Sequence, residues 1–206
     1  MTTIRSLNLQ DLPQAAQVHL KAFPKSALTL LGAESVRRYY EWQIVGPHDC
    51  LALGAFDESG RLVGFCFGGI FRGALSGFLA RNKKYLALQV IQRPWLVFTN
   101  PLFRDRLSQG LRIVRKRNRT EKPTGPAPGK VFGILSIAVD PACQQKGIGR
   151  QLMEYSETYA KAHGFASMRL TVAPENLHAI QFYEMNNWKK QSAAADWNGL
   201  MVKDLR

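Results

Sequence analysis

The spacing of apolar residues changes several times along this chain, and each change marks a predicted element. In the first third, short apolar runs between turn residues indicate strands, and apolar residues three and four positions apart indicate helices. Asn8 and Asp11 offer N-caps, Gly46-Pro47 breaks a helix, and Gly60 closes a turn between two apolar runs, which predicts an antiparallel hairpin. The predicted elements are a strand over 2–7, a helix to residue 22, a helix from 32 or 34 to 43, and strands over 51–56 and 62–71.

Residues 131–188 read as an apolar strand, a loop with two glycines, a helix, a second strand and a second helix. Gly164 offers the first helix a stop, and two further short strands are predicted around Asn198-Gly199. The first strand lacks strict alternation, which predicts that both of its faces are buried. The inward face predicted for the first helix contains Ile148, Leu152, Tyr155, Tyr159 and Ala162. Together with the first third, this order predicts the α/β class, a mixed sheet with helices on its faces.

Between these two parts the chain is helical in pattern and strongly basic. Residues 72–130 contain nine Arg and five Lys against Asp105 and Glu121, so they carry a net +12 of the formal charge of +13. Apolar residues at helical spacing predict one helix or two short ones before Pro94, and further helical stretches after Pro94 and Pro101. We therefore predict one domain over 1–206 with an inserted basic helical segment at about 72–130.

The composition excludes several classes of protein. A chain of 206 residues with 46% hydrophobic content can bury a core of its own. Its three cysteines lie far apart and form neither a disulfide framework nor a metal-ligand spacing, so we predict a reducing cytoplasm and no metal. The N-terminus lacks the apolar core of a signal peptide, and the apolar run 62–71 is about half the length that spans a bilayer. Glycines at 64, 68 and 69 in that run indicate a bulge or the close approach of another backbone.

The loop 144–150 follows a buried strand and opens a helix, where free backbone N–H groups and the helix dipole favour an anion. Gly147 and Gly149 let the backbone approach a phosphate, and Lys146 and Arg150 add positive charge. Taken alone, such a glycine pair also fits a purely structural turn. The loop lacks the third glycine of a dinucleotide-binding motif and the Gly-Lys-Ser/Thr of a P-loop.

With its flanking segments, this loop resembles the motifs of the GNAT superfamily of acyl-CoA N-acyltransferases. Their pyrophosphate loop reads Gln/Arg-x-x-Gly-x-Gly/Ala after a strand that ends in Val-Asp/His-Pro, and the match here is Gln144-x-x-Gly147-x-Gly149 after Val139-Asp140-Pro141. A second family signature follows as Asn176-x-x-Ala179-x-x-Phe182-Tyr183. Where the family usually has Gly before an aromatic residue, this chain has Asn187, which tolerates a left-handed backbone. The resemblance covers about residues 131–190 and implies a mixed, mostly antiparallel central sheet flanked by helices.

The resemblance also implies acetyl-CoA as co-substrate and direct attack of a neutral amine on its thioester. Ile137, Ala138 and Val139 match the strand that pairs with the pantetheine arm, and a backbone N–H near Val139 matches the group that holds the oxyanion. Tyr183 matches a tyrosine that protonates the leaving thiolate, although its spacing fits a core tyrosine equally well. The residues implied to bind the cofactor are Ile137, Ala138, Val139, Gln144, Gln145, Lys146, Gly147, Ile148, Gly149, Arg150, Asn176 and Tyr183.

The general base is the weakest part of the match. Many relatives place Glu or Asp on the strand before the loop, where this chain has only Ser136, our second catalytic candidate beside Tyr183. A chain of water molecules is one alternative. The others are four residues of the N-terminal region for which a solvent-exposed role fits as well: Glu41, Tyr39, Tyr40 and His48.

The acceptor is the open half of the prediction. Residues 23–32 and Tyr39-Tyr40 loosely resemble the N-terminal region of GNAT proteins associated with sugar and polysaccharide biosynthesis, so an amino sugar is our first choice and a peptide or protein amine the alternative. The basic segment, with Trp95 and Phe98, fits a solvated face, an anionic membrane surface or an acidic carrier. A homodimer is left open, and nucleic acid ranks last because no nucleic-acid-binding module is recognisable. The competing hypothesis is a non-catalytic acyl-CoA-binding protein or membrane-surface adaptor on the same fold.

Overall fold

A computed structural model of the chain describes residues 2–99, 103–104, 130–192 and 197–206. Its strands form a seven-stranded sheet in the order β1-β2-β3-β4-β5-β7-β6. They are β1 (Thr3–Ser6), β2 (Asp49–Phe56), β3 (Leu62–Ile70), β4 (Val131–Val139), β5 (Ser167–Thr171), β6 (Lys189–Lys190) and β7 (Leu200–Asp204). Neighbouring strands are antiparallel except for β4 and β5, which are parallel. The predicted mixed and mostly antiparallel sheet, including its hairpin, is confirmed.

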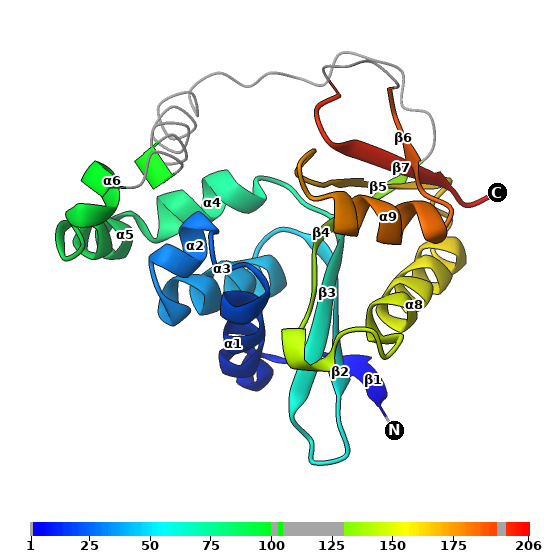
Figure 1. The fold of residues 1–206 in the computed structure, drawn as a ribbon, viewed down its shortest axis with the longest axis horizontal. Coiled ribbons are helices and arrows are strands. Elements are labelled where there is room, and N and C mark those ends of the chain that lie inside the picture. Colours follow the sequence, from blue (N-terminus) through cyan, green and yellow to red (C-terminus); the bar gives the residue numbers. More distant parts are fainter. Residues whose placement is uncertain (1, 100–102, 105–129, 193–196) are drawn as a thin grey trace.

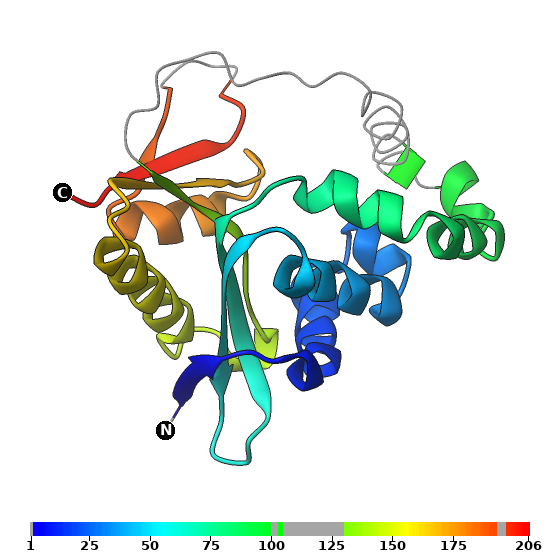
Figure 2. The same cartoon turned by 180° about the vertical axis from the view of Figure 1, so that it is seen from behind.

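Helices cover both faces of this sheet (Figure 1). On one face lie α1 (Leu12–Ala22), α2 (Ala27–Leu30) and α3 (Ala33–Val45), and on the other lie α8 (Ile148–Ala162) and α9 (Leu177–Met185). The segment after β3 forms α4 (Ala74–Arg81), α5 (Lys83–Ile91) and α6 (Trp95–Thr99), which extend away from the sheet beside α2 and α3 (Figures 1 and 2). Of the two alternatives predicted before Pro94, one helix or two short ones, the structure has two short helices. The helix predicted after Pro101 falls mostly outside the described residues.

Two apolar clusters enclose the sheet, one under each layer of helices. The cluster below α8 and α9 includes Phe132, Ile134, Leu152, Met168 and Trp188. The cluster below α1 and α3 includes Leu12, Val36, Tyr40, Phe65 and Phe67. Because β4 contributes to both clusters, its predicted packing on two faces is confirmed, although six of its nine residues are only half-buried. Within the described ranges, none of the helices combines the length and apolar content needed to cross a bilayer.

The inward face predicted for α8 is partly wrong. Tyr155, predicted to be inside, is 54% exposed, whereas Met153 and Ala160 are buried. The centre of the buried face is Ser156, whose hydroxyl donates to the Leu152 carbonyl at 2.9 Å and is thereby satisfied inside the core. A polar residue at the centre of the face shifts the apparent apolar stripe in the sequence towards Tyr155.

Polar contacts fix the ends of two elements where the sequence predicted them. Before α1, the Asn8 side chain accepts from the Asp11 N–H, and the Asp11 carboxylate accepts from the Asn8 N–H, which is a reciprocal capping box. After α9, Asn187 has a φ of 64°, so the predicted left-handed terminator is confirmed. The Trp188 N–H then donates to the Tyr183 carbonyl at 3.0 Å and closes the helix end.

Candidate active site

β4 contains a bulge that decides which way its side chains face. Opposite β3, Phe67 pairs with Ser136 but Gly68 pairs with Ile134, so Leu135 is an extra residue on β4. Leu135 packs against the cluster under α1 and α3, and the Ser136 hydroxyl lies 3.0 Å from a hydroxyl of α3. Two successive side chains therefore face α1 and α3. The run of glycines on β3 had indicated a bulge, but not its position.

The second half of β4 has an open edge. In the described structure, β5 pairs with β4 only over residues 131–133. The Asp140 N–H donates to the Val63 carbonyl of β3 at 2.8 Å. Because backbone groups alternate between the two edges of a strand, those of Ile137 and Val139 point away from β3, towards the side that β5 has left. This edge offers the donors and acceptors that an extended, amide-containing chain binds by strand addition.

The loop after β4 leads from this open edge to the start of α8. Its first residue, Asp140, is buried, and its carboxylate accepts from Lys21 Nζ at 2.8 Å and from the Ala142 N–H at 3.1 Å. The Lys21 hydrogen bond, together with that of Ala142, holds the pKa of the Asp140 carboxyl below its usual range despite burial. These contacts anchor the loop to α1.

At the N-terminus of α8 the backbone is shaped to receive an anion. Gln145 and Gly147 have φ values of 62° and 75°, so the loop makes two left-handed steps before the helix begins. Gly147 is the N-cap residue and contributes no side-chain acceptor, so the N–H groups of the first turn are left for another partner. A Cβ on Gly147 would have no atom within 4 Å, so the space beside its backbone is open. Residues 144–147 are exposed, as a ligand-binding loop requires.

The remaining predicted donor-side residues have structural roles as well. Gln144 Nε2 donates to the Val139 carbonyl at 3.3 Å, across the start of the open edge. Arg150 forms an exposed ion pair with Glu154 at 2.7 Å. The Asn176 side chain accepts from the Ala179 N–H at 3.1 Å and caps α9, which leaves its amide NH₂ group for a ligand.

Tyr183 lies at the inner side of α9, with 9% of its surface exposed. Its ring is 5.3 Å from that of Phe182 and 6.0 Å from that of Trp188. Burial raises the pKa of the Tyr183 phenol, so the group stays protonated near neutral pH and can act as a proton donor. Packing and catalysis are both compatible with this position.

Of the four alternative bases, the described contacts bring Tyr40 alone to β4. Its buried hydroxyl lies 3.0 Å from Ser136 Oγ. Glu41 pairs with Arg37 on the outer side of α3, the Tyr39 ring packs edge-on against a phenylalanine of α4, and His48 Nδ1 accepts a backbone N–H of the loop after β3.

Sequence reasoning missed His19. It is buried on the inner face of α1, and its Nδ1 lies 2.8 Å from the Tyr40 hydroxyl. Burial lowers the pKa of the imidazole to about 4, so it is neutral near pH 7. The available signal was its spacing, four residues after Ala15 and seven after Leu12, which places it on the inward face of the helix.

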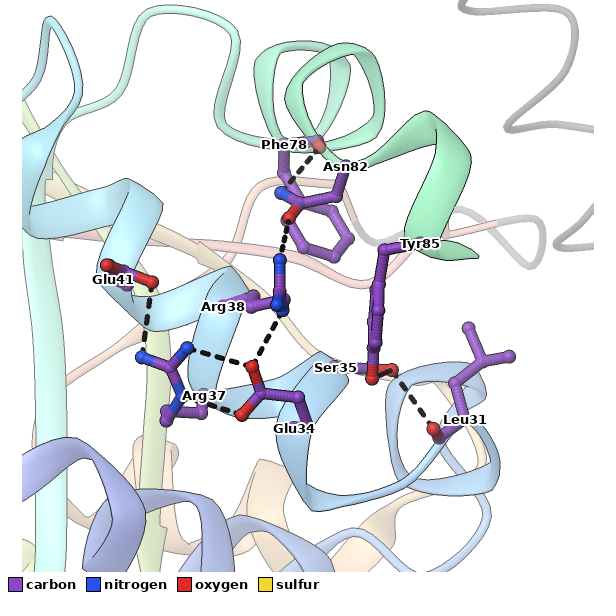
Figure 3. A network of polar contacts seen from close by, with 9 residues as sticks. All are labelled: Leu31, Glu34, Ser35, Arg37, Arg38, Glu41, Phe78, Asn82 and Tyr85. Carbon is purple, nitrogen blue, oxygen red and sulfur yellow. Dashed lines mark hydrogen bonds and ion pairs between the residues drawn. The ribbon is translucent and has the colours of Figure 1, made fainter. Parts of the chain in front are cut away.

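A second polar cluster lies on the outer side of α3 (Figure 3). Glu34 accepts from both Arg37 and Arg38, and the Arg37 bond in particular, with that of Arg38, lowers the pKa of Glu34 to about 2. Arg38 also donates to Asn82 at 3.3 Å and covers the Tyr85 ring at 4.3 Å. A cavity of about 280 Å³ lies beside this network, between α3 and α4. The contacts of Arg38 with Asn82 and Tyr85 join α3 to α4 and α5. Because the charged groups of the network pair with one another, we assign it no catalytic role.

Comparisons with known proteins bear on this site. The family model described as acetyltransferase (GNAT) family matches residues 13–187, and no curated protein matches the chain. A solved structure of the PaiA N-acetyltransferase from Thermoplasma acidophilum with coenzyme A is 16% identical, covers 99% of both chains and has a TM-score of 0.58. The ribosomal-protein-S18-alanine N-acetyltransferase from Escherichia coli is 18% identical, covers 100% of this chain and 94% of its own, and has a TM-score of 0.56.

An aminoglycoside N-acetyltransferase, AAC(6')-Iy, solved with CoA, is 14% identical, covers 94% of this chain and 91% of its own, and has a TM-score of 0.58. At these identities the likenesses to solved structures show a shared fold. The family match extends over the N-terminal helices as well as the loop 144–150 and α9, and so includes both sides of the candidate site.

Proposed function

We infer that this chain, which belongs to the acetyltransferase (GNAT) family, transfers the acetyl group of acetyl-CoA to a primary amine of a small molecule. The observation that carries the proposal is the open edge of β4 that runs directly into the N-terminus of α8. A strand edge and a helix N-terminus are the two sites that the amide-bearing arm and the pyrophosphate of CoA require. An extended ligand can bind both at once.

For the donor, we propose that the edge groups of Ile137 and Val139 pair with the pantetheine arm, and that the backbone of residues 145–150 binds the pyrophosphate. Ala138, between the two edge residues, directs its N–H towards β3 and closes the strand against it. Lys146 adds positive charge at the exposed side of the loop. The open space beside Gly147 admits a phosphate oxygen to the backbone.

For the chemistry, we propose direct attack. The amine nitrogen forms a bond to the thioester carbon, and a backbone N–H at the open edge stabilises the developing oxyanion. The C–S bond then breaks, the positively charged nitrogen loses one proton, and the thiolate of CoA takes a proton from the Tyr183 phenol, which recovers one from solvent. The products are the N-acetylated amine and CoA. Burial keeps Tyr183 in the protonated form that this step needs.

The experiment that tests this function separates binding from turnover. Calorimetry with acetyl-CoA is expected to show binding, and Tyr183→Phe is expected to lower kcat much more than acetyl-CoA affinity. Tyr159→Phe, on the adjacent helix α8, serves as a control for losing a partly buried phenol. Equal losses of kcat and affinity in Tyr183→Phe would assign that residue to packing. Acetyl-CoA binding with no transfer to any amine of a broad panel would favour the non-catalytic hypothesis.

For the acceptor, we propose an amino sugar. The loose resemblance of residues 23–32 to sugar-related family members supports this choice, as does the fold shared with an aminoglycoside N-acetyltransferase. The alternative is a peptide amine, which the fold shared with a protein-alanine N-acetyltransferase supports. A panel of amino sugars, amino acids, polyamines and peptide N-termini, compared by kcat/KM, decides between them.

We further propose that α4–α6 attach the protein to an anionic membrane surface. Leu86 and Val90 of α5 pack against the small cluster of Leu31, Leu96 and Phe103, so the inner side of this arm is already apolar. The exposed large apolar residues of α5 and α6 are Leu88, Ile91, Trp95 and Phe98. Residues 72–104 contain six Arg or Lys and no Asp or Glu. Exposed aromatic groups within a purely cationic segment match an anionic lipid interface.

Sedimentation with vesicles tests the attachment. Binding to vesicles that contain phosphatidylserine is expected, weaker with added salt and absent on neutral vesicles, and Trp95→Ala with Phe98→Ala should abolish it. Leu9→Ala, which removes an exposed apolar residue far from α6, is the control. Lack of vesicle binding, or self-association that the double variant removes, would contradict the membrane as the partner of this surface.

A further inference from the structure

A continuous line of hydrogen-bonded side chains connects β4 to α2. It begins at Ser136, whose Oγ lies 3.0 Å from the Tyr40 hydroxyl, and continues to His19 Nδ1, 2.8 Å from that hydroxyl. We call the whole line the polar chain: Ser136, Tyr40, His19, Ser26 and Thr29. Tyr40 and His19 are buried, and the Tyr40 hydroxyl and both ring nitrogens of His19 have their hydrogen-bond partners within the polar chain.

The far end of the polar chain fixes its direction. Thr29 Oγ1 donates to the Phe23 carbonyl at 2.7 Å, and a carbonyl can only accept. Ser26 Oγ donates to Thr29 Oγ1 at 2.9 Å, so its contact of 3.1 Å with His19 Nε2 needs the imidazole to be the donor. A neutral imidazole has one donor and one acceptor. His19 therefore carries its proton on Nε2 and accepts at Nδ1.

The same order of donors and acceptors continues along the polar chain to Ser136 on β4. Since His19 Nδ1 accepts, Tyr40 donates its hydroxyl proton to it and can only accept from Ser136. Ser136 in turn donates its proton to Tyr40, so its lone pairs are left for another donor. Ser136 is half-buried and lies next to Ile137, whose backbone groups face the open edge. The group best suited to meet an oxygen that only accepts is an N–H.

We propose that the polar chain makes Ser136 the hydrogen-bond acceptor for the attacking amine and conducts the amine proton to His19. The inference rests on the function proposed above and supplies the base that β4 lacks as a carboxylate. Ser136 is then a catalytic residue, because it touches the substrate. Tyr40 and His19 act through it, and Ser26 and Thr29 hold the direction of the chain.

The proton transfer balances along the chain. As the C–N bond forms, the nitrogen becomes positively charged and one of its N–H protons moves to Ser136 Oγ. The proton of Ser136 moves to the Tyr40 oxygen, and that of Tyr40 moves to His19 Nδ1, which becomes an imidazolium. Product release lets the proton return along the same line to solvent. Burial disfavours the imidazolium, so the imidazole is in its free-base form at the start of every cycle.

Kinetics of three variants test the proposal. Tyr40→Phe should lower kcat for the amine by roughly 10²-fold, within the range of general-base effects, and leave acetyl-CoA affinity unchanged. Tyr39→Phe, the adjacent tyrosine of α3, is the control. Ser136→Ala should cause a similar loss, and the double variant should be no slower than either single one, because the residues act as a unit. A Tyr40→Phe enzyme as fast as Tyr39→Phe would overturn the proposal.

The far end of the polar chain gives the sharpest test, since Thr29 belongs to α2 and not to β4. Thr29→Val keeps the shape but removes the donor that fixes the direction, and we expect a several-fold loss of kcat with unchanged acetyl-CoA affinity. Thr158→Val is the matched control, because Thr158 also donates its hydroxyl to a backbone carbonyl, that of Glu154. Wild-type kcat in Thr29→Val would assign the polar chain to holding α1 and α3 on the sheet.

One measurement does not depend on activity. The imidazole nitrogen shifts of His19 in the free protein should report a neutral ring with the proton on Nε2. A proton on Nδ1 would overturn the direction of the chain even if the protein acetylates an amine. If no amine is acetylated but His19 has the expected tautomer, the proposed function fails and the relay fails with it. If Tyr183→Phe behaves as expected while the Tyr40 and Thr29 variants do not, the relay alone fails.

Discussion

Gly147 and Gly164 stand at opposite ends of α8 in the same backbone conformation. Their φ values are 75° and 72°, and a Cβ at either position would have no atom within 4 Å. An alanine at either site therefore costs only the left-handed backbone, about 1–2 kcal/mol. Alanine also makes the unfolded chain less flexible than glycine does, and this offsets about 0.4–1 kcal/mol of the backbone cost. Gly147→Ala and Gly164→Ala should thus lower the free energy of unfolding by the same small amount, about 1 kcal/mol, in urea titrations.

Binding of acetyl-CoA should separate the two variants. Gly147 is the N-cap residue of α8, and its Cβ would project into the space that we assign to the pyrophosphate. Displacing a phosphate from the N–H groups of the first turn should lower the affinity for acetyl-CoA by roughly ten-fold or more, which corresponds to about 1.4 kcal/mol of binding free energy. Gly164 follows the other end of the helix, so Gly164→Ala should bind acetyl-CoA as tightly as the unmodified protein. Calorimetry at a temperature where both variants are folded measures the difference.

Two results would refute this reasoning. Equal acetyl-CoA affinities for the two variants would mean that the pyrophosphate does not approach Gly147, and the loop 144–150 would lose its assigned role. A much lower stability of Gly147→Ala than of Gly164→Ala would mean that the loop holds a contact that the backbone conformation alone does not explain.

Three further predictions concern stability. The pKa of Asp140 is lowered in the folded protein, so its carboxylate contributes stability that is fully present above the unfolded-state pKa of about 4 and is lost as the pH falls through the lower folded-state value. In urea titrations, the loss of unfolding free energy in Asp140→Asn should therefore be constant near neutral pH and become smaller below about pH 4. Gly69→Ala should cost about 3 kcal/mol or more, because φ is 139° and a Cβ would lie 1.9 Å from a carbonyl oxygen of β2. Gly60→Ala in the open hairpin turn should cost about 1 kcal/mol, as at Gly147 and Gly164, and similar losses in Gly69→Ala and Gly60→Ala would contradict the clash. Asn187→Gly should raise the melting temperature, because glycine adopts the left-handed backbone without the steric cost, and a lower melting temperature would show that the Asn side chain is needed.

Most of the fold could be predicted because its elements are long relative to their turns. Every predicted strand is present, α1 and α3 end within about two residues of their predicted limits, and α8 ends just before the predicted stop at Gly164. The helix α2 was missed because it is a single turn, which apolar periodicity cannot distinguish from a loop. Its boundary is set by the side chain of Ser26, which accepts from the Thr29 N–H.

The candidate site was predictable where it is local in sequence and not where it depends on packing. The loop 144–150 could be identified because its glycines and flanking motifs are contiguous. The contact between His19 and Tyr40 joins residues 21 positions apart, and that between Tyr40 and Ser136 joins residues 96 positions apart. Neither leaves a pattern in one sequence. The open edge of β4 depends on where β5 stops pairing, which is a property of the sheet.

The bulge at Leu135 connects the two halves of the site. Ile134 and Ile137 pack on the α8 and α9 side, with Leu135 and Ser136 between them facing α1 and α3. In a regular strand, side chains alternate, so residues 134 and 137 could not share a face. If the same residues, Leu135 included, formed a regular strand, keeping Ile134 in its cluster would turn Ser136 away from Tyr40 and would send the edge groups of Ile137 towards β3. The lack of alternation in this strand therefore has two causes, burial on both faces and the bulge. The same bulge directs the backbone groups of Ile137 to the edge that β5 leaves open and the Ser136 hydroxyl to the side of α1 and α3.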